Sequence, residues 1–265
     1  MAKAARKLAS ALGVYRLYEK VLESEVLSDG RIPSHVAVIL DGNRRWAREE
    51  GVPIEAGYKE GARRVEDFLE WCYDAGVKTV TLYALSTENV LRRSPEEIQI
   101  LLSILREYLR RELQERELVK RKVKVKAIGF LELLPADIVA GVKELERRTE
   151  GYSDRFLNIA LAYGGRAEIV DAARRIAGDV LAGALRIEDI DEKIFEKYLQ
   201  TSHLPNPYPD LVIRTSGELR ISNFLLWQIA YSELVFLDVY WPEFRKIDFL
   251  RALRTYQRRS RRFGA

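Results

Sequence analysis

Short apolar runs alternate along this chain with longer segments in which apolar residues recur every three or four positions. Such runs are typical of buried strands, and the longer segments are typical of amphipathic helices. The pattern predicts strands at residues 35–40, 78–84, 123–128, 156–163, 211–214 and 234–239, and helices at residues 95–119, 135–149, 166–181 and from about 248. Because strands that alternate with helices form parallel sheets covered on both faces, we expect a single α/β domain with a mostly parallel six-stranded sheet flanked by helices.

Residues 1–30 form an N-terminal extension with an amphipathic pattern of its own. Leu8, Leu12, Tyr15, Tyr18 and Leu22 follow one another at helical spacing with basic residues between them, which predicts a helix to about residue 27. Packing on the domain or a partner and binding at a membrane surface both use this pattern. Packing is the favoured interpretation.

Composition places the 265-residue chain among globular proteins, with 47% hydrophobic and 32% charged residues. Its single cysteine, Cys72, and its two histidines exclude an internal disulfide and a structural zinc site of Cys and His ligands, as expected for a cytoplasmic protein. No run approaches the ~18 apolar residues of a spanning helix, and the N-terminus lacks the apolar core of a signal peptide. Neither export nor membrane spanning is therefore expected.

Positive charge gathers at one end of the chain. The net charge is +4, and the last fifteen residues hold six arginines and no acid, so the rest is slightly acidic. A nucleic-acid enzyme more often spreads positive charge over a whole face. No nucleic-acid partner is expected, although an RNA-binding role for the tail stays open as an alternative.

Polar residues follow several predicted strands. In open α/β sheets, ligands bind at the carboxyl ends of the strands. The segments at these ends are residues 41–46, 86–89, 163–166 and 214–218. All four segments are therefore candidate parts of one site.

The first such segment suits a phosphate group. In HVAVILDGNRRW, Asp41 ends a strand, Gly42 permits close backbone approach, and Arg44 and Arg45 add cations at the start of a helix. Taken alone, the motif favours a helix N-cap formed by Asp41 or Asn43, with exposed arginines, and the neighbouring motifs reverse this preference.

The second segment suits a diphosphate. In VIRTSGELRISNF, Arg214 and Arg220 flank a Ser/Gly turn, and Ser222 follows. Guanidinium forks and hydroxyl donors are the groups that bind diphosphate oxygens. A surface salt-bridge cluster is the alternative.

These segments point to electrostatic catalysis with a divalent cation. Mg²⁺ typically takes one or two carboxylates plus phosphate oxygens, and Asp41 and Glu233 would suffice. The chain lacks an Asp-Asp-x-x-Asp run, a P-loop and a Gly-x-Gly-x-x-Gly fingerprint, and Cys72 is interpreted as core packing. A site of this kind suits ionisation of an allylic diphosphate, with an apolar tunnel to shield the carbocation from water. ILLSILREYL could line that tunnel, although such segments are more often plain core.

Four strings occur in the order HVAVILDGNRRWA, TLYALSTENVLRR, LNIALAYGGR and DLVIRTSGELRISNFLLWQIAYSELVF, and from about residue 34 to 264 the chain closely resembles the cis-prenyltransferase family. This family includes undecaprenyl and dehydrodolichyl diphosphate synthases, and the chain looks similar to archaeal members. The resemblance implies a homodimer with a six-stranded, mostly parallel sheet and a hydrophobic tunnel. It also implies Mg²⁺-dependent, repeated condensation of isopentenyl diphosphate onto an allylic diphosphate such as farnesyl or geranylgeranyl diphosphate. The product would be a long polycis-polyprenyl diphosphate, a precursor of glycosyl carrier lipid, released with peripheral contact to a membrane surface.

The resemblance also assigns roles to individual residues. It implies that Asp41 is the catalytic metal ligand and that Asn89 is a catalytic residue in a loop that orients isopentenyl diphosphate and assists proton loss. It also implies that Glu233 completes the metal site, in one chain or from the other subunit. The implied substrate-binding residues are Gly42, Asn43, Arg44, Arg45, Trp46, Tyr58, Ser86, Thr87, Glu88, Arg92, Arg214, Arg220, Ile221 and Ser222. The ending Arg262-Phe263-Gly264 resembles a family ending that reaches across the dimer. On this basis Asp41→Ala is expected to remove turnover and to leave stability nearly intact.

The chain departs from the family pattern at four positions. It has Ile54 and Tyr58 where many members have Arg and His, Val90 where an aromatic residue is common, and Ala162 where Asn is frequent. The smaller residues are interpreted as room for a bulkier starter such as geranylgeranyl diphosphate. The rival interpretation is a non-catalytic activating subunit of the same fold, but such subunits lose the Asp-Gly-Asn-Arg loop that this chain keeps.

Overall fold

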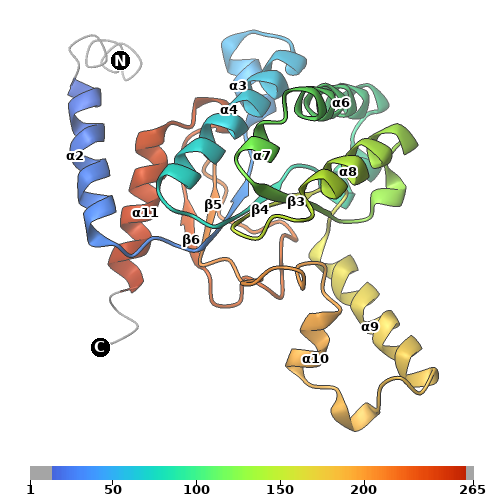
Figure 1. Cartoon of the computed structure of the whole chain (residues 1–265). Helices are drawn as coiled ribbons and strands as arrows, with labels where there is room; N and C mark the ends of the chain where they lie inside the picture. Colours follow the sequence, from blue (N-terminus) through green and yellow to red (C-terminus); the bar gives the residue numbers. More distant parts are fainter. Residues whose placement is uncertain (1–13, 261–265) are drawn as a thin grey trace.

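The computed structural model describes residues 14–260, and a parallel sheet forms its centre (Figure 1). Within these residues the sheet has six strands in the order β3-β4-β2-β1-β5-β6, and every neighbouring pair is parallel. The strands are β1 (His35–Ile39), β2 (Thr79–Tyr83), β3 (Val123–Ile128), β4 (Arg155–Ala160), β5 (Leu211–Arg214) and β6 (Glu233–Phe236). The predicted fold class is confirmed.

Helices connect the strands, as the alternating pattern predicts. They are α2 (Val14–Asp29), α3 (Asn43–Glu50), α4 (Ile54–Asp74), α5 (Thr87–Arg92), α6 (Pro95–Glu115), α7 (Glu117–Lys120), α8 (Ala136–Thr149), α9 (Gly165–Leu181), α10 (Glu192–Lys197) and α11 (Lys246–Ser260). The helix predicted at residues 95–119 starts where expected, because Ser94 caps it and Pro95 fits its first turn. It breaks at Arg116, whose φ of 61° is left-handed, so that α6 and α7 are separate.

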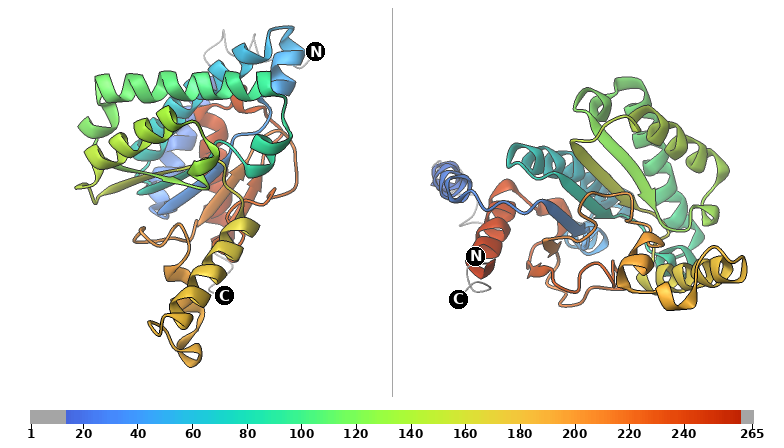
Figure 2. Two further views of the ribbon diagram at one scale, coloured as in Figure 1. Left: turned by 90° about the vertical axis from the view of Figure 1, so that its right-hand side faces the viewer. Right: turned by 60° about the horizontal axis from the view of Figure 1, so that its bottom comes forward.

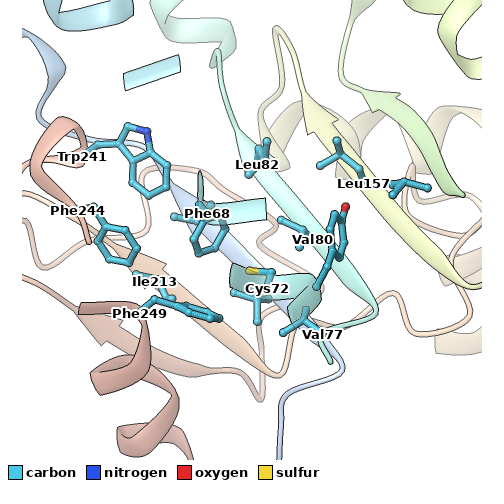
Figure 3. Packing of buried hydrophobic residues seen from close by; sticks show 14 of the residues in the cluster. Phe68, Cys72, Val77, Val80, Leu82, Leu157, Ile213, Trp241, Phe244 and Phe249 are labelled. Atoms are coloured by element: carbon cyan, nitrogen blue, oxygen red, sulfur yellow. The ribbon is translucent and has the colours of Figure 1, made fainter. Parts of the chain in front are cut away.

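The main hydrophobic core lies between one face of the sheet and helices α4, α6, α8 and α11. At its centre the Phe68 ring packs edge-on against Trp241 and Phe249, each at a centroid distance of 5.5 Å (Figure 3). Cys72 is fully buried in the same cluster, and burial raises the pKa of its thiol. Its interpretation as a packing residue is confirmed.

The opposite face of the sheet is covered differently. Its apolar side chains, among them Ile39, Tyr83 and Val212, pack against Phe224 and Leu225 of the segment between β5 and β6. Tyr83 stacks on Phe224 at 4.5 Å. Helices α9 and α10 extend away from the sheet instead (Figures 1 and 2). Both faces of the sheet are thus covered, as expected, and on this face an irregular segment forms the cover.

Helix α2 packs on α11, beside the rest of the fold (Figure 1). Leu22 and Val26 are buried, and the Gln257 side chain of α11 donates to the Val26 carbonyl at 2.8 Å. For residues 14–29 the structure thus has the helix packed on the domain. Residues 1–13 of the predicted extension lie outside the described residues. No helix within residues 14–260 is long and apolar enough to cross a membrane.

His35, at the start of β1, is completely buried. Its Nδ1 lies 3.1 Å from the Asn206 carbonyl oxygen and therefore donates to it, which leaves Nε2 to accept the Thr81 hydroxyl at 2.7 Å. Burial lowers the pKa of His35 from 6.5 to about 3, against the opposite effect of the Asn206 bond. The imidazole is accordingly neutral throughout the physiological range.

This buried imidazole predicts an acid-sensitive fold. The unfolded chain protonates His35 first, so stability begins to fall near the unfolded pKa of 6.5 and continues to fall down to about pH 3. Between pH 7 and 5 we expect His35 alone to contribute a loss of about 2 kcal/mol. Urea unfolding of wild type and His35→Gln at both pH values measures this loss of unfolding free energy, because the variant has no imidazole to protonate at residue 35. Parallel losses in the two proteins, or an NMR titration of His35 near pH 6.5, would contradict the prediction.

Candidate active site

Two sequence motifs meet at the carboxyl edge of the sheet. Asp41 follows β1, Arg214 ends β5, and the two strands are neighbours with Ile39 opposite Arg214. Arg214 Nη2 donates to Asp41 Oδ2 at 2.7 Å. The Thr215 hydroxyl donates to the Asp41 carbonyl at 2.7 Å and accepts from its amide at 3.1 Å, which fixes the backbone there. The predicted proximity of these motifs is therefore observed.

Arg214 is buried, with 4% of its surface exposed, and its guanidinium organises the loop that follows β5. Nη1 donates to the Ser222 hydroxyl at 2.7 Å and to the Arg220 carbonyl. Its Nε is buried and has no partner among the described residues. Since buried donors are almost always paired, this N–H is a donor for which residues 14–260 supply no acceptor.

Asp41 is ionised under ordinary conditions. Partial burial raises the pKa of its carboxyl, but the Arg214 hydrogen bond and the charges of Arg214 and Arg45 outweigh it, so the pKa lies below its usual value. Arg45 Nη2 is 3.3 Å from Asp41 Oδ1, a weaker contact than that of Arg214. One carboxylate oxygen is thus tightly held and the other loosely.

Arg45 and Arg220 share an acid that lies outside the predicted set. Arg45 Nη1 donates to Glu218 at 2.9 Å, and Arg220 donates to the other oxygen of the same carboxylate. Arg45 also donates to the Ser216 hydroxyl, and its guanidinium lies 5.7 Å from the centre of the Tyr240 ring. The Arg220 side chain is 64% exposed, in contrast to that of Arg214.

Gly42 occupies a position that other residues fit poorly. Its φ of 108° is left-handed, and a Cβ there would lie 2.7 Å from the Tyr240 ring. Asn43 begins α3, donating to the Leu40 carbonyl at 3.1 Å, while its Oδ1 is buried without a partner among the described residues. Trp46 is half-buried one turn later. The backbone at Gly42 is therefore closely enclosed next to Asp41.

The segment after β2 joins the same edge. Ser86 caps α5, and its hydroxyl accepts from the Asn89 amide at 3.0 Å and from the Asn89 side chain. Glu88 accepts from the Asn223 side chain at 2.8 Å and from the Thr87 hydroxyl at 3.2 Å. Asn89 is thus positioned as a hydrogen-bonding amide, which suits orientation of a substrate rather than proton abstraction.

Two polar cavities adjoin at this edge. One, of about 380 Å³, is lined by residues that include Asp41, Gly42, Asn43, Arg44, Arg45, Arg48, Tyr58, Arg93, Glu218 and Arg220. The other, of about 370 Å³, is lined by Arg44, Glu88, Asn89, Arg92, Arg93, Ser94 and Glu97. Arg44 and Arg93 line both. The two cavities provide room for two anionic groups side by side.

An apolar cavity of about 400 Å³ lies between α4, α6 and the sheet. Leu69, Leu82 and Leu157 line it, together with Leu105 and Leu109 from the segment predicted to line a tunnel. Its outer rim is charged, with Glu66 and Arg111 among the lining residues. The described structure thus has an apolar space beside the main core at the predicted helix.

The structure corrects the place of Glu233. This residue begins β6 opposite Leu211, the first residue of β5, so it lies at the amino edge of the sheet, whereas Asp41 lies at the carboxyl edge. Its carboxylate accepts from Arg259 at 3.2 Å. The expectation that both carboxylates hold one metal is therefore wrong within a single copy of the chain. The reason is that only the last residues of a parallel strand lie at the carboxyl edge of the sheet, and Glu233 is the first residue of β6.

The other predicted positions are placed as follows. Arg92 is exposed in the second polar cavity, and Ile221 packs against the second core. Of the four departures, Ile54 is 44% exposed, Val90 packs against the main core, Ala162 is buried with a φ of 47°, and Tyr58 lines the first polar cavity. Arg262–Gly264 lies outside the described residues.

The residues at the carboxyl edge fit a magnesium ion held jointly with a substrate. Residues 14–260 contain no cluster of three or more His, Cys, Asp or Glu side chains that would hold a metal by themselves. Mg²⁺ commonly needs only one or two carboxylates when phosphate oxygens supply the rest. Asp41, ionised and with one loosely held oxygen, is a suitable donor.

Comparison with known proteins agrees with this geometry. A family model described as "Putative undecaprenyl diphosphate synthase" matches residues 39–264. The chain is 55% identical over 251 residues, 95% of its length and 91% of the relative's, to a protein of Methanopyrus kandleri. A protein of Pyrococcus horikoshii is 52% identical over 250 residues, covering 94% of this chain and 93% of the relative. Both relatives are named tritrans,polycis-undecaprenyl-diphosphate synthase (geranylgeranyl-diphosphate specific). The chain belongs to the undecaprenyl diphosphate synthase family.

Solved structures extend this family relationship to the fold. Lavandulyl diphosphate synthase from Lavandula x intermedia, crystallised with dimethylallyl diphosphate, superposes with a TM-score of 0.82 at 38% identity, covering 85% of this chain and 95% of that one. A probable undecaprenyl diphosphate synthase from Campylobacter jejuni gives 0.70 at 30% identity, covering 88% and 99%. The chain is thus a prenyltransferase of the cis-prenyltransferase family, and the recognition made from its motifs is confirmed.

Several residues at the edge of this family member were missed from the sequence. Glu218 and Ser216 stand inside a predicted motif, and their position next to Arg214 was the available signal. Arg93 follows Arg92 at the end of the TLYALSTENVLRR string, which was the available signal. Tyr240 and Glu97 had none, because they belong to a loop and a helix start that only the tertiary fold brings to the cavity.

Proposed function

We propose that this chain is a Mg²⁺-dependent cis-prenyltransferase that condenses isopentenyl diphosphate repeatedly onto geranylgeranyl diphosphate or farnesyl diphosphate. The product is a long-chain, undecaprenyl-type polycis-polyprenyl diphosphate, the precursor of a glycosyl carrier lipid, and its release involves contact with a membrane surface. The meeting of the ionised Asp41 with Arg214 and Arg45 at the carboxyl edge carries this proposal. The names of the archaeal relatives favour geranylgeranyl diphosphate as the starter.

The arginines and backbone donors act on the leaving group. In the proposed reaction the allylic C–O bond breaks and the diphosphate departs with the electron pair. Arg44, Arg45 and the enclosed backbone at Gly42 supply donors to the developing negative charge in a cavity already lined by cations. Mg²⁺ held by Asp41 would add further charge neutralisation to the diphosphate.

The second substrate supplies the electrons for the new bond. Arg214, Arg220, Ile221 and Ser222 are proposed to hold isopentenyl diphosphate, and Asn89 with Ser86 orients its alkene. The alkene π electrons form the new C–C bond to the allylic carbon, and loss of a proton from the adjacent carbon restores a double bond. Because an amide is not a strong base, the released diphosphate is proposed as the proton acceptor.

A homodimer is part of the proposal. Glu233 lies at the amino edge in each copy, so its proposed role in the metal site requires a second copy to present it. The Arg262–Gly264 ending is proposed to reach the same site. Sedimentation analysis of the full chain tests this: a monomer at working concentration with full activity would overturn it.

The experiment for the proposed function is an incubation of the purified protein with labelled isopentenyl diphosphate, MgCl₂ and allylic starters of different length. We expect extended products whose mass identifies the chain length, with the highest kcat/KM for geranylgeranyl diphosphate. Omission of MgCl₂ in the presence of a chelator should abolish extension. A folded protein that extends none of the starters would overturn the proposal.

A further inference from the structure

Tyr240 follows β6 and lies in a short segment that is hydrogen-bonded to both loops of the site. On one side of it, the Val239 carbonyl accepts from the Ser216 amide at 2.7 Å. On the other side, the Trp241 amide donates to the Asp41 carbonyl at 3.0 Å. The backbone at Tyr240 is therefore fixed relative to the loop after β1 and to the loop after β5.

The Tyr240 side chain contacts α3 at two points. The Arg45 guanidinium carbon lies 5.7 Å from the ring centre, within the range of a cation–π contact. One helical turn later, Glu49 accepts from the Tyr240 hydroxyl at 2.5 Å, and this bond raises the pKa of the phenol. The ring also packs on Gly42, where a Cβ would lie 2.7 Å from it. Backbone and side-chain contacts therefore hold the ring in one place beside Arg45.

The Tyr240 ring differs in kind from the oxygen acceptors around Arg45. Asp41, Glu218 and Ser216 accept from the guanidinium N–H groups, which are the groups that bind a diphosphate. The ring attracts the cation through its π electrons and brings no negative charge to the cavity. A diphosphate can therefore replace the oxygen acceptors without competing with the ring.

We propose that Tyr240 is a positioning residue for Arg45. Its ring keeps the guanidinium directed at the first polar cavity while the oxygen acceptors of that guanidinium exchange for diphosphate oxygens. The inference rests on the proposed function, because it assumes that a substrate diphosphate enters the cavity that Arg45 lines. Tyr240 itself lies outside the residues that line this cavity, so it acts through Arg45. By limiting the positions of Arg45 in advance, the ring lowers the entropic cost of binding.

Calorimetric titration of the full chain with inorganic diphosphate tests the role of the ring. Tyr240→Leu removes the π face, so we expect affinity to fall about 3- to 10-fold, whereas Tyr240→Phe keeps the ring and should stay within about twofold of wild type. In an Arg45→Gln background, Tyr240→Leu should change affinity by less than about twofold, because no guanidinium is left to position. In steady-state assays, Tyr240→Leu should raise KM for the allylic diphosphate about 3- to 10-fold and KM for isopentenyl diphosphate less than about twofold.

The matched control is Tyr198→Leu, because Tyr198 makes the same two kinds of contact with α9. The Arg175 guanidinium carbon lies 5.3 Å from its ring centre, and its hydroxyl donates to Asp179, one turn later, at 2.5 Å. Helix α9 extends away from the sheet (Figures 1 and 2). We therefore expect Tyr198→Leu to leave diphosphate affinity unchanged.

Three results would overturn the positioning role. They are wild-type affinity in Tyr240→Leu, an equal loss with and without Arg45, and a loss in Tyr240→Phe as large as in Tyr240→Leu, which would assign the effect to the hydroxyl. Tyr240→Met fills more of the volume of the ring without a π face, and it replaces Tyr240→Leu if that variant does not fold. The titrations need no turnover, so failure of the proposed function shows separately, as wild-type protein that binds diphosphate and extends no starter.

Discussion

Replacement of Asp41 by asparagine should lower the condensation rate by about three orders of magnitude or more, equivalent to about 4 kcal/mol of transition-state stabilisation. Asparagine retains an oxygen that accepts from Arg214 Nη2, the contact that holds the aspartate at 2.7 Å. It lacks the negative charge that a magnesium ion requires from its ligand. Single-turnover rates with labelled isopentenyl diphosphate measure the effect, and thermal unfolding should show a smaller fall in the midpoint than for Asp41→Ala, because the amide keeps the hydrogen bond although it loses the charge.

Asp41→Ala is a less clean test than the sequence suggests. The alanine leaves Arg214, 4% exposed, without its carboxylate, and an uncompensated buried charge is destabilising. We therefore expect Asp41→Ala to lose both activity and stability, whereas Asp41→Asn keeps the hydrogen bond to Arg214 and should lose less stability for the same loss of activity. An Asp41→Asn protein that condenses within tenfold of the wild-type rate would contradict the proposed role of the carboxylate.

Arg214→Gln should have the second-largest effect, because it acts on both binding and stability. The substitution removes the donors to Asp41, Ser222 and the Arg220 carbonyl, which together fix the loop after β5. We expect KM for isopentenyl diphosphate to rise about a hundredfold. Stability should fall by about 2–3 kcal/mol, less than for a fully buried pair because Asp41 is partly exposed. Steady-state kinetics and urea unfolding measure the two quantities.

Arg220→Gln is the matched control for burial. It removes the same charge from the same motif, but its side chain is 64% exposed and its carboxylate partner, Glu218, also binds Arg45. Its unfolding free energy should change by less than about 0.5 kcal/mol, while substrate binding weakens. If Arg214→Gln and Arg220→Gln were equally stable, the buried Arg214 guanidinium would not be what fixes the loop after β5.

The sequence predicts best what local pattern and chain direction determine. The sheet and the pairing of Asp41 with Arg214 follow from apolar runs and from polar residues at strand ends. The same rule misplaces Glu233, because it stands at the start of a strand. The contacts of Arg93 with Tyr58 and Glu97 could not be predicted from the sequence. They depend on the angle between α4 and α6, which the hydrophobic pattern does not determine. The irregular segment that covers Tyr83 could not be predicted either, because its sequence has no repeating hydrophobic pattern.

The segment between β5 and β6 both contributes residues to the site and covers one face of the sheet. This restricts which substitutions the enzyme can accept there. Ser216, Ser222 and Leu225 adopt left-handed backbone conformations within it, and Phe224 seals one side of the sheet. A change there that alters ligand contacts also disturbs the packing under the segment. The apolar cavity, in contrast, lies outside this segment, and side chains of α4 and α6 line it together with Leu82 and Leu157 of the sheet. New preferences for starter or chain length are therefore expected to evolve on the helical side, while the β5–β6 connection stays nearly fixed.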